Sequence, residues 1–436
     1  MWFATPSSQW TFTTYSLPVS RRTLLTTGML MGAGAWGGAG AWGKPQRTPA
    51  VPVGFAEPMI TLHQAVAEAW ARLPQRNSLA AQQNSAAARY LAGGAIVPNA
   101  PTAVASHFND RIAGSNYNYI TTQVGVSTPV WLPGEGTATQ NAAQAERVAI
   151  EAQAAMAHLV LAADVLRLAT SATDAANTRA IAARRLATSR ALAGALSRQF
   201  AVGEAAQSDA LAAEADAANA AVTLAQAESQ LGAAKVALVE VTGSPAIPAL
   251  IVSAGMAPVP EGEHPQLRAA MEQVQAAQAQ QRLVYLQDRD DPEIGLQGIN
   301  EKQPGTRWDT RFGVTVTFHF ATEARNAPRR AVAQEAVTNA AVQLEVARRR
   351  VAAAVAQGRV MLDAAERASV AAERGAAALE KRRGQIERAW RLGEMPFIEL
   401  VRANALAFDA ESARENARTG RAAAALQLRI AQGALP

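Results

Sequence analysis

Residues 306–320 have the sequence TRWDTRFGVTVTFHF, in which apolar and polar side chains alternate almost strictly. Such alternation predicts a β-strand with one apolar and one polar face. Fifteen residues at about 3.3 Å each reach about 50 Å, enough to cross a bilayer with tilt. We therefore expect a transmembrane barrel strand, and the alternative is a half-buried strand of a soluble sheet. The expected lipid-facing residues are Trp308, Phe312, Val314, Val316 and Phe318, followed by Phe320.

Three further segments are candidate partners of this strand. Residues 292–302 (PEIGLQGINEK) would pair with it across a turn at Gln303-Pro304-Gly305. The first half of the chain offers 103–112 and 117–127. Four strands cannot close a barrel alone, so a barrel would need several chains. Aromatic residues suited to membrane interfaces are Tyr117, Tyr119, Trp131, Trp308 and Phe320.

The chain contains an internal duplication. Residues 198–217 (RQFAVGEAAQSDALAAEADA) match 388–407 (RAWRLGEMPFIELVRANALA) without gaps at an offset of 190. Upstream, 124–127 match 312–315 at an offset of 188. Such a long period indicates duplication of a large unit rather than a solenoid. The matched positions of the turn are Phe200 with Trp390, Gly203 with Gly393, Glu204 with Glu394, and Asp209 with Glu399.

The duplication predicts the domain boundaries. We expect a first repeat at 42–243, a linker at 244–263 and a second repeat at 264–436. After a short N-terminal helix, the first repeat would contain a strand pair at about 103–131 and a helix hairpin at about 138–243. After its own first helix, the second would contain a strand pair at about 292–320 and a hairpin at about 329–432.

The hairpin helices are predicted to pack as antiparallel coiled coils. Apolar residues recur every seven positions, and the seam between them is mostly alanine, which lets helices approach closely. The alternative from the helices alone is a soluble coiled-coil rod. The heptad residues are Leu224, Leu231, Leu238, Val337, Leu344 and Val351.

Residues 1–41 are predicted to be an export signal. The pair Arg21-Arg22 precedes a weakly apolar, Gly-broken stretch that ends in small residues at 39–41. The alternative is an N-terminal membrane anchor, but the segment lacks about 20 strongly apolar residues. Beyond this segment we expect no membrane-spanning helix.

Composition excludes several functional classes. Lys+Arg number 41 and Asp+Glu 36, without a basic stripe, so we expect no nucleic-acid partner. The chain has no cysteine, which excludes disulfides and thiolate chemistry. Its five histidines are scattered, with no metal-ligand spacing. We therefore expect no enzyme, no cofactor and no metal site.

In the order of these features, the chain resembles the TolC family of outer-membrane efflux channels. The resemblance covers nearly all of the chain after the export signal. It implies a homotrimer in the outer membrane of a Gram-negative bacterium, with four strands per chain forming one twelve-stranded barrel. A long α-helical tunnel would continue the barrel through the periplasm. The motifs that carry it are Phe200-Ala201-Val202-Gly203 with Asp209, Trp390-Arg391-Leu392-Gly393 with Glu399, 238–243 (LVEVTG), and His264-Pro265-Gln266-Leu267.

The resemblance also implies roles for the turns. Gly203-Glu204 and Gly393-Glu394 would form periplasmic tips at which adaptor proteins dock. Asp209 and Glu399 would face the tunnel as carboxylate rings, although a solvated helix face explains them equally well. Residue 402, an acid position in the family, is arginine here, so Arg402 could pair with Glu399 instead. Phe200 and Trp390 would pack or narrow the tip.

The resemblance further implies passive transport powered by an inner-membrane pump. The turn 390–394 (WRLGE) is most similar to the Czc/Cus-type branch, whose RND pumps export metal cations. Channels for drugs or for type I secretion share most of these matches and remain alternatives. A periplasmic coiled-coil adaptor or scaffold is a third possibility.

Overall fold

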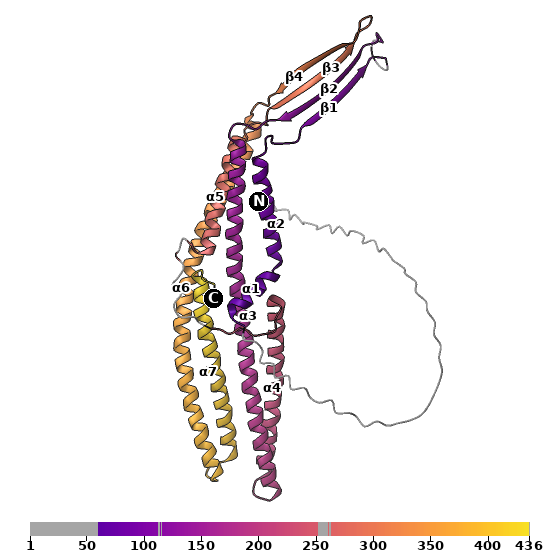
Figure 1. Cartoon of the computed structure of the whole chain (residues 1–436). Helices are drawn as coiled ribbons and strands as arrows, with labels where there is room; N and C mark the ends of the chain where they lie inside the picture. Colours follow the sequence, from indigo (N-terminus) through magenta and orange to yellow (C-terminus); the bar gives the residue numbers. More distant parts are fainter. Residues whose placement is uncertain (1–59, 112–113, 115, 252–259, 261–262, 436) are drawn as a thin grey trace, which may run out of the picture. The chain divides into compact units, whose positions relative to one another are not determined.

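The computed structural model describes residues 60–111, 114, 116–251, 260 and 263–435. The predicted export signal lies outside these residues. The order of elements repeats along the chain, with a helix, two strands and a long helix hairpin in each half (Figure 1). The elements are α1 (Leu62–Arg72), α2 (Pro74–Gly93), β1 (Thr102–Asn109), β2 (Ile120–Pro129), α3 (Glu135–Ala201), α4 (Gln207–Thr242), α5 (Pro265–Leu286), β3 (Glu293–Lys302), β4 (Asp309–Thr317), α6 (Glu323–Arg391) and α7 (Phe397–Ala431).

The outgoing helices of the two hairpins are very long. Helix α3 has 67 residues and α6 has 69, and at 1.5 Å per residue each extends about 100 Å. Helix α6 begins six residues before the predicted start and contains Pro328. A proline costs little this close to the start of a helix, because it removes only one early backbone hydrogen bond. The chain therefore continues as helix through a residue that sequence reasoning treats as a boundary.

Alanines form the tightest parts of the helix seams. In α4, Ala213, Ala220 and Ala227 lie seven residues apart and are buried, whereas the predicted heptad residues Leu224 and Leu231 are only half-buried. Helix α6 repeats this spacing with buried alanines at 333, 340 and 347. A methyl group at the contact lets two helix backbones approach more closely than leucine would.

The four strands form one antiparallel sheet in the order β1-β2-β3-β4. Strand β4 has nine residues and is shorter than the predicted 306–320. The turn after β3 explains this, because Gly305 has φ +77° and Thr306 donates to the Gln303 carbonyl oxygen at 3.1 Å. The ladder then starts again only at Asp309, which pairs with Glu301. Nine residues still suffice for a transmembrane β-strand.

One finding differs from the expectation for membrane helices. Helix α3 contains an 18-residue window with a mean hydropathy of 1.4, long and apolar enough to span a membrane by length and composition. Its apolar residues Leu159, Val165 and Leu166 are buried in a core that α1 and α7 share. Packing against other helices therefore accounts for the apolar character of α3.

Candidate functional site

The two turns that join the long helices have the same backbone structure. Gly203 has φ +83° and Gly393 has φ +77°, a region that glycine enters without steric cost. Gly203 donates to the Phe200 carbonyl oxygen at 3.0 Å and Glu204 donates to that of Gln199 at 2.8 Å. The second turn repeats both bonds 190 residues later, at 2.9 Å each. This pair of bonds is the Schellman motif, which ends a helix in a left-handed residue.

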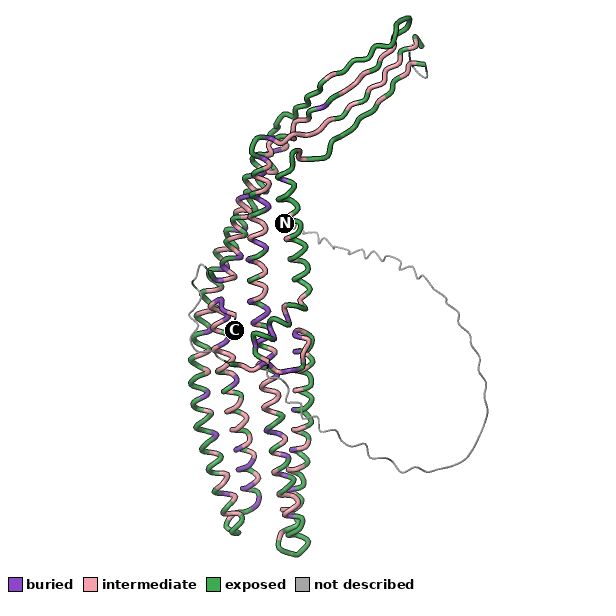
Figure 2. Tube along the Cα trace, in the orientation of Figure 1, coloured by how far each residue is buried: buried purple, intermediate pink, exposed green. Residues whose placement is uncertain are grey.

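Both turns are exposed, as Figure 2 shows at the helix ends away from the sheet. Residues 201–204 and 391–394 are all exposed, and they include Glu204 and Glu394. The two turns thus present carboxylates and free backbone surface to solvent. Such a surface is accessible to a protein partner.

Asp209 and Glu399 occupy equivalent positions in the first turns of the returning helices. Each donates its backbone N–H to the residue three before it, Ala206 or Pro396, at 3.1 Å. Acidic side chains are favourable there because a helix N-terminus carries partial positive charge. Both residues are half-buried.

The two acids differ in their partners. Arg402 Nη1 donates to Glu399 Oε1 at 2.7 Å, three residues along the same helix. The first hairpin has Ala212 at the position equivalent to Arg402. Within the described residues Asp209 makes no ion pair with a basic side chain. The repeats therefore place one neutralised and one free carboxylate at matched positions.

The aromatic residues of the turns also differ. Trp390 packs against Phe397 with ring centroids 6.1 Å apart, and Phe397 is buried. Phe200 remains 43% exposed. The residue equivalent to Phe397 in the first hairpin is Gln207, so Phe200 lacks an aromatic neighbour in that position.

An apolar cluster joins the two hairpins close to their turns. Phe397 and Leu400 of α7 belong to it, together with Leu196 of α3 and Ala213 of α4. Leu400 is 1% exposed. Separating the hairpins here would expose this surface to water, so the cluster favours their close association.

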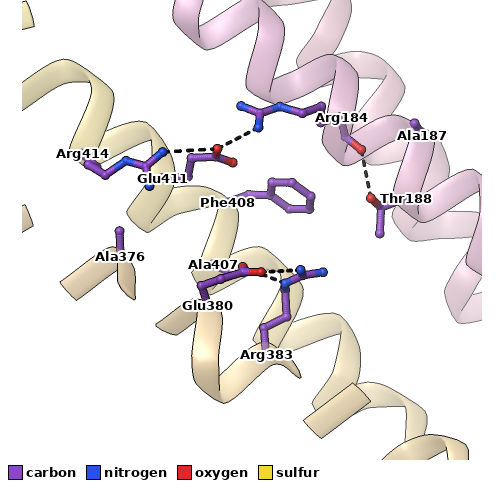
Figure 3. A pocket seen from close by; sticks show the side chains of 10 residues that line it. All are labelled: Arg184, Ala187, Thr188, Ala376, Glu380, Arg383, Ala407, Phe408, Glu411 and Arg414. Atoms are coloured by element: carbon purple, nitrogen blue, oxygen red, sulfur yellow. Dashed lines mark hydrogen bonds and ion pairs between the residues drawn. The ribbon is translucent and has the colours of Figure 1, made fainter. Parts of the chain in front are cut away.

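A charged cavity lies farther from the turns, between α3, α6 and α7 (Figure 3). Its volume is about 430 Å³. Arg184 of α3 contacts Glu411 of α7 at 2.8 Å, and Arg414 approaches the same carboxylate at 3.6 Å. Arg383 pairs with Glu380 on α6. Sequence reasoning missed this tie between hairpins, although the spacing of Glu411 and Arg414 indicates a local pair.

The sheet has one apolar face and one polar face. Residues opposite each other in an antiparallel ladder point to the same side. Val314 pairs with Leu296, and Leu296 pairs with Val126, so these three share a face. The apolar face also carries Phe312, Val316, Ile294 and Val124. Phe312 is 88% exposed, which is unusual for a side chain of this size.

The predicted aromatic positions at the ends of the strand lie just beyond the ladder. Trp308 precedes β4 and Phe318 follows it, and both side chains are exposed. Lys302 Nζ lies 5.8 Å from the ring centroid of Trp308. A Trp paired with Lys at a strand end is typical of a membrane interface, where amphipathic side chains accumulate.

Hydrogen bonds and ion pairs cover the opposite face. Gln123 Nε2 donates to Gln297 Oε1 at 2.9 Å, linking β2 to β3. Nearer the helices, Ser127 Oγ donates to Glu293 Oε2 at 3.0 Å. At the far end, Arg311 pairs with Glu301. The polar side chains therefore satisfy one another across the strands.

No family model and no curated protein matches the sequence. Solved structures do match. A membrane protein from Pseudomonas aeruginosa is 21% identical with a TM-score of 0.67, covering 85% of this chain and 93% of its own. The Campylobacter jejuni CmeC outer-membrane channel is 14% identical with a TM-score of 0.68, covering 85% of each chain.

A third match is CusC, which forms a transmembrane channel. It is 16% identical with a TM-score of 0.64, covering 86% of this chain and 92% of its own. These likenesses confirm the predicted fold class. The chain has the TolC-like channel fold, in which a four-stranded antiparallel sheet and long antiparallel helix hairpins occur together in one duplicated chain.

Proposed function

We propose that this protein is an outer-membrane channel that works as a homotrimer. The observation that carries the proposal is the two-faced sheet, whose outer strands β1 and β4 have no further neighbour among the described strands. In lipid, unpaired strand edges are too costly to persist. Three copies would supply twelve strands, close the barrel and turn the apolar face toward lipid.

The long helices would extend the channel into the periplasm of a Gram-negative bacterium. With a length of about 100 Å, α3 and α6 would carry the two turns far from the membrane. The exposed turns at Gly203-Glu204 and Gly393-Glu394 suit docking of a periplasmic adaptor. Transport would be passive, and an inner-membrane pump, which we propose to be of the RND type, would supply the energy.

We further propose that the carboxylates near the turns attract cations into the tunnel. Three copies of Asp209 around a threefold axis would form a negative ring. Glu399 would contribute less, because Arg402 lies 2.7 Å from its carboxylate and offsets its charge. The selectivity of this channel would then depend mainly on the first repeat.

For the cargo we propose metal cations or other small toxic compounds. The support is the similarity of the turn at 390–394 to the metal-exporting branch of RND systems. The test is deletion of the gene, followed by growth on panels of divalent metals and lipophilic drugs, with complementation. Hypersensitivity confined to metals supports the cation proposal, and sensitivity to drugs alone assigns the channel to multidrug efflux. A secretion defect without either sensitivity assigns it to type I secretion.

Cell fractionation separates the channel from the alternative of a soluble adaptor or scaffold. The expected result is a heat-modifiable trimer in the outer-membrane fraction that forms ion-conducting pores in planar bilayers. A soluble periplasmic protein without pore activity would refute the channel. The two experiments are independent, because the first tests the cargo and the second tests the pore.

A further inference from the structure

The segment that links α5 to β3 is held from two sides by different chemistry. On one side lies the start of α6, where Arg325 pairs with Asp290. Asn326 Nδ2 donates to the Asp288 carbonyl oxygen at 2.5 Å, and Arg329 Nη1 donates to that of Gln287 at 3.2 Å. These contacts rest on arginines and an amide, which keep their charge state across the physiological pH range.

On the other side, the start of α3 holds the same segment through carboxyl groups. Glu135 is 4% exposed, and its Oε1 accepts from Gln287 Nε2 at 2.7 Å. The Leu132 N–H donates to Glu135 Oε2 at 3.4 Å. The Asp291 carboxyl forms a hydrogen bond with that of Glu135. Two carboxyls can share a hydrogen bond only when one of them carries a proton.

The local charges make this proton matter. Among the described residues neither Glu135 nor Asp291 has a basic partner within ion-pair distance. Burial, followed by the hydrogen bond to Glu135 and its negative charge, raises the pKa of Asp291 to about 6. The neighbouring Asp290 behaves oppositely, because its hydrogen bond to Arg325 lowers its pKa.

The other charged groups around this pair all lie on the α6 side or on the linking segment itself. They are Asp288, Arg289 and Asp290 of the segment, Arg325 and Arg329 of α6, and His319 between β4 and α6.

We propose that Glu135 and Asp291 form a proton-dependent clasp, which holds the α5–β3 segment against the start of α3 while the pair shares a proton and loosens when both carboxyls are ionised. A raised carboxyl pKa means that the folded state binds the proton more tightly than the unfolded state. The clasp is therefore closed below about pH 6 and weakens as the pH rises through that value. The α6 side stays fixed throughout.

The consequence is a junction that can adjust on one side only. The same segment continues into β3, and the Val130 N–H donates to the Pro292 carbonyl oxygen at 2.9 Å where the strands begin. Loosening the clasp would free this end of the sheet from α3 while α6 still holds it. The inference does not depend on the proposed channel activity.

Hydrogen–deuterium exchange of the full-length protein in detergent tests the clasp. The peptide covering 287–292 is followed at pH 5 and pH 8, with intrinsic exchange rates corrected. Opening of this segment should increase by up to about 100-fold at pH 8, because that value lies two units above the pKa of Asp291. Asp291→Asn should abolish the increase and keep the segment protected, because the amide can donate to ionised Glu135 at both pH values.

Glu135→Gln is the second variant and should also abolish the increase. Two controls should keep it. Asp290→Asn breaks the ion pair with Arg325 but leaves the clasp intact, and His319→Gln removes the other group that titrates nearby. The proposal is wrong if the native protein shows no pH dependence in this segment, or if Asp291→Asn and Glu135→Gln retain it unchanged.

Discussion

Placing a charge on the apolar face of β4 is the most direct test of the membrane assignment. Phe312 is the fourth of nine residues in the strand and 88% exposed, so in a barrel it would lie close to the middle of the bilayer. An arginine at that depth costs about 2–4 kcal/mol per chain. A trimer carries three copies, so Phe312→Arg should destabilise assembly by about 6–12 kcal/mol.

The assay is the yield of heat-modifiable trimer in the outer-membrane fraction at equal expression. We expect a loss of at least about tenfold, because even 2 kcal/mol exceeds a factor of ten in an equilibrium constant. Thr315→Arg is the matched control, since Thr315 lies on the polar face of the same strand and its arginine would face water. Equal trimer yields for the two variants would refute the assignment of the faces.

Three other predictions concern the helices. Gly393→Ala should destabilise the protein by about 1–2 kcal/mol through its positive φ alone, since no atom lies within 4 Å of the added methyl; urea unfolding in detergent should show no such loss for Gly375→Ala, at an open helical position. Arg402→Ala should raise the cation-to-anion permeability ratio by freeing its carboxylate partner, and Asp209→Ala should lower it; unchanged reversal potentials in a KCl gradient would make both residues ordinary surface. Burial lowers the pKa of His158, so the folded state disfavours its proton and stability should fall as the pH drops below the ordinary histidine value near 6.5; His158→Phe should remove this acid sensitivity from hydrogen exchange in α1, and a sensitivity that persists would assign it elsewhere.

The sheet was the most predictable part of the fold. Alternation at 309–317 has a period that only a strand can satisfy, and the cross-strand register places Val314, Leu296 and Val126 on one face. The strand ends were less predictable. Alternation continues through Trp308 and Phe318, yet the ladder stops before both residues because the turn at Gly305 sets where pairing begins.

The hairpin turns show what a repeat can and cannot predict. The match of Gly203 with Gly393 extends to the same Schellman hydrogen bonds, because backbone geometry follows from the glycine and the helix end. Side-chain partners do not follow from it. Trp390 packs on Phe397, whereas Phe200 stays exposed, since the residue that would support it is Gln207.

Contacts between distant segments were beyond sequence reasoning. Arg184 and Glu411 lie 227 positions apart and meet at 2.8 Å only because α3 packs beside α7. Glu135 and Asp291 are likewise brought together by the fold. Neither pair has a local spacing pattern, so a single sequence carries no signal for them.

The difference between the two turns has a consequence for any partner that approaches the helix ends. Three copies of the proposed channel would display six turns, alternating between one with the exposed ring of Phe200 and one whose Trp390 is covered by Phe397. Their backbones are alike, so a partner that contacts only main-chain atoms would find six equivalent places. A partner that grips side chains would find two sets of three. The number of partner molecules bound at saturation would therefore reveal which kind of contact it makes.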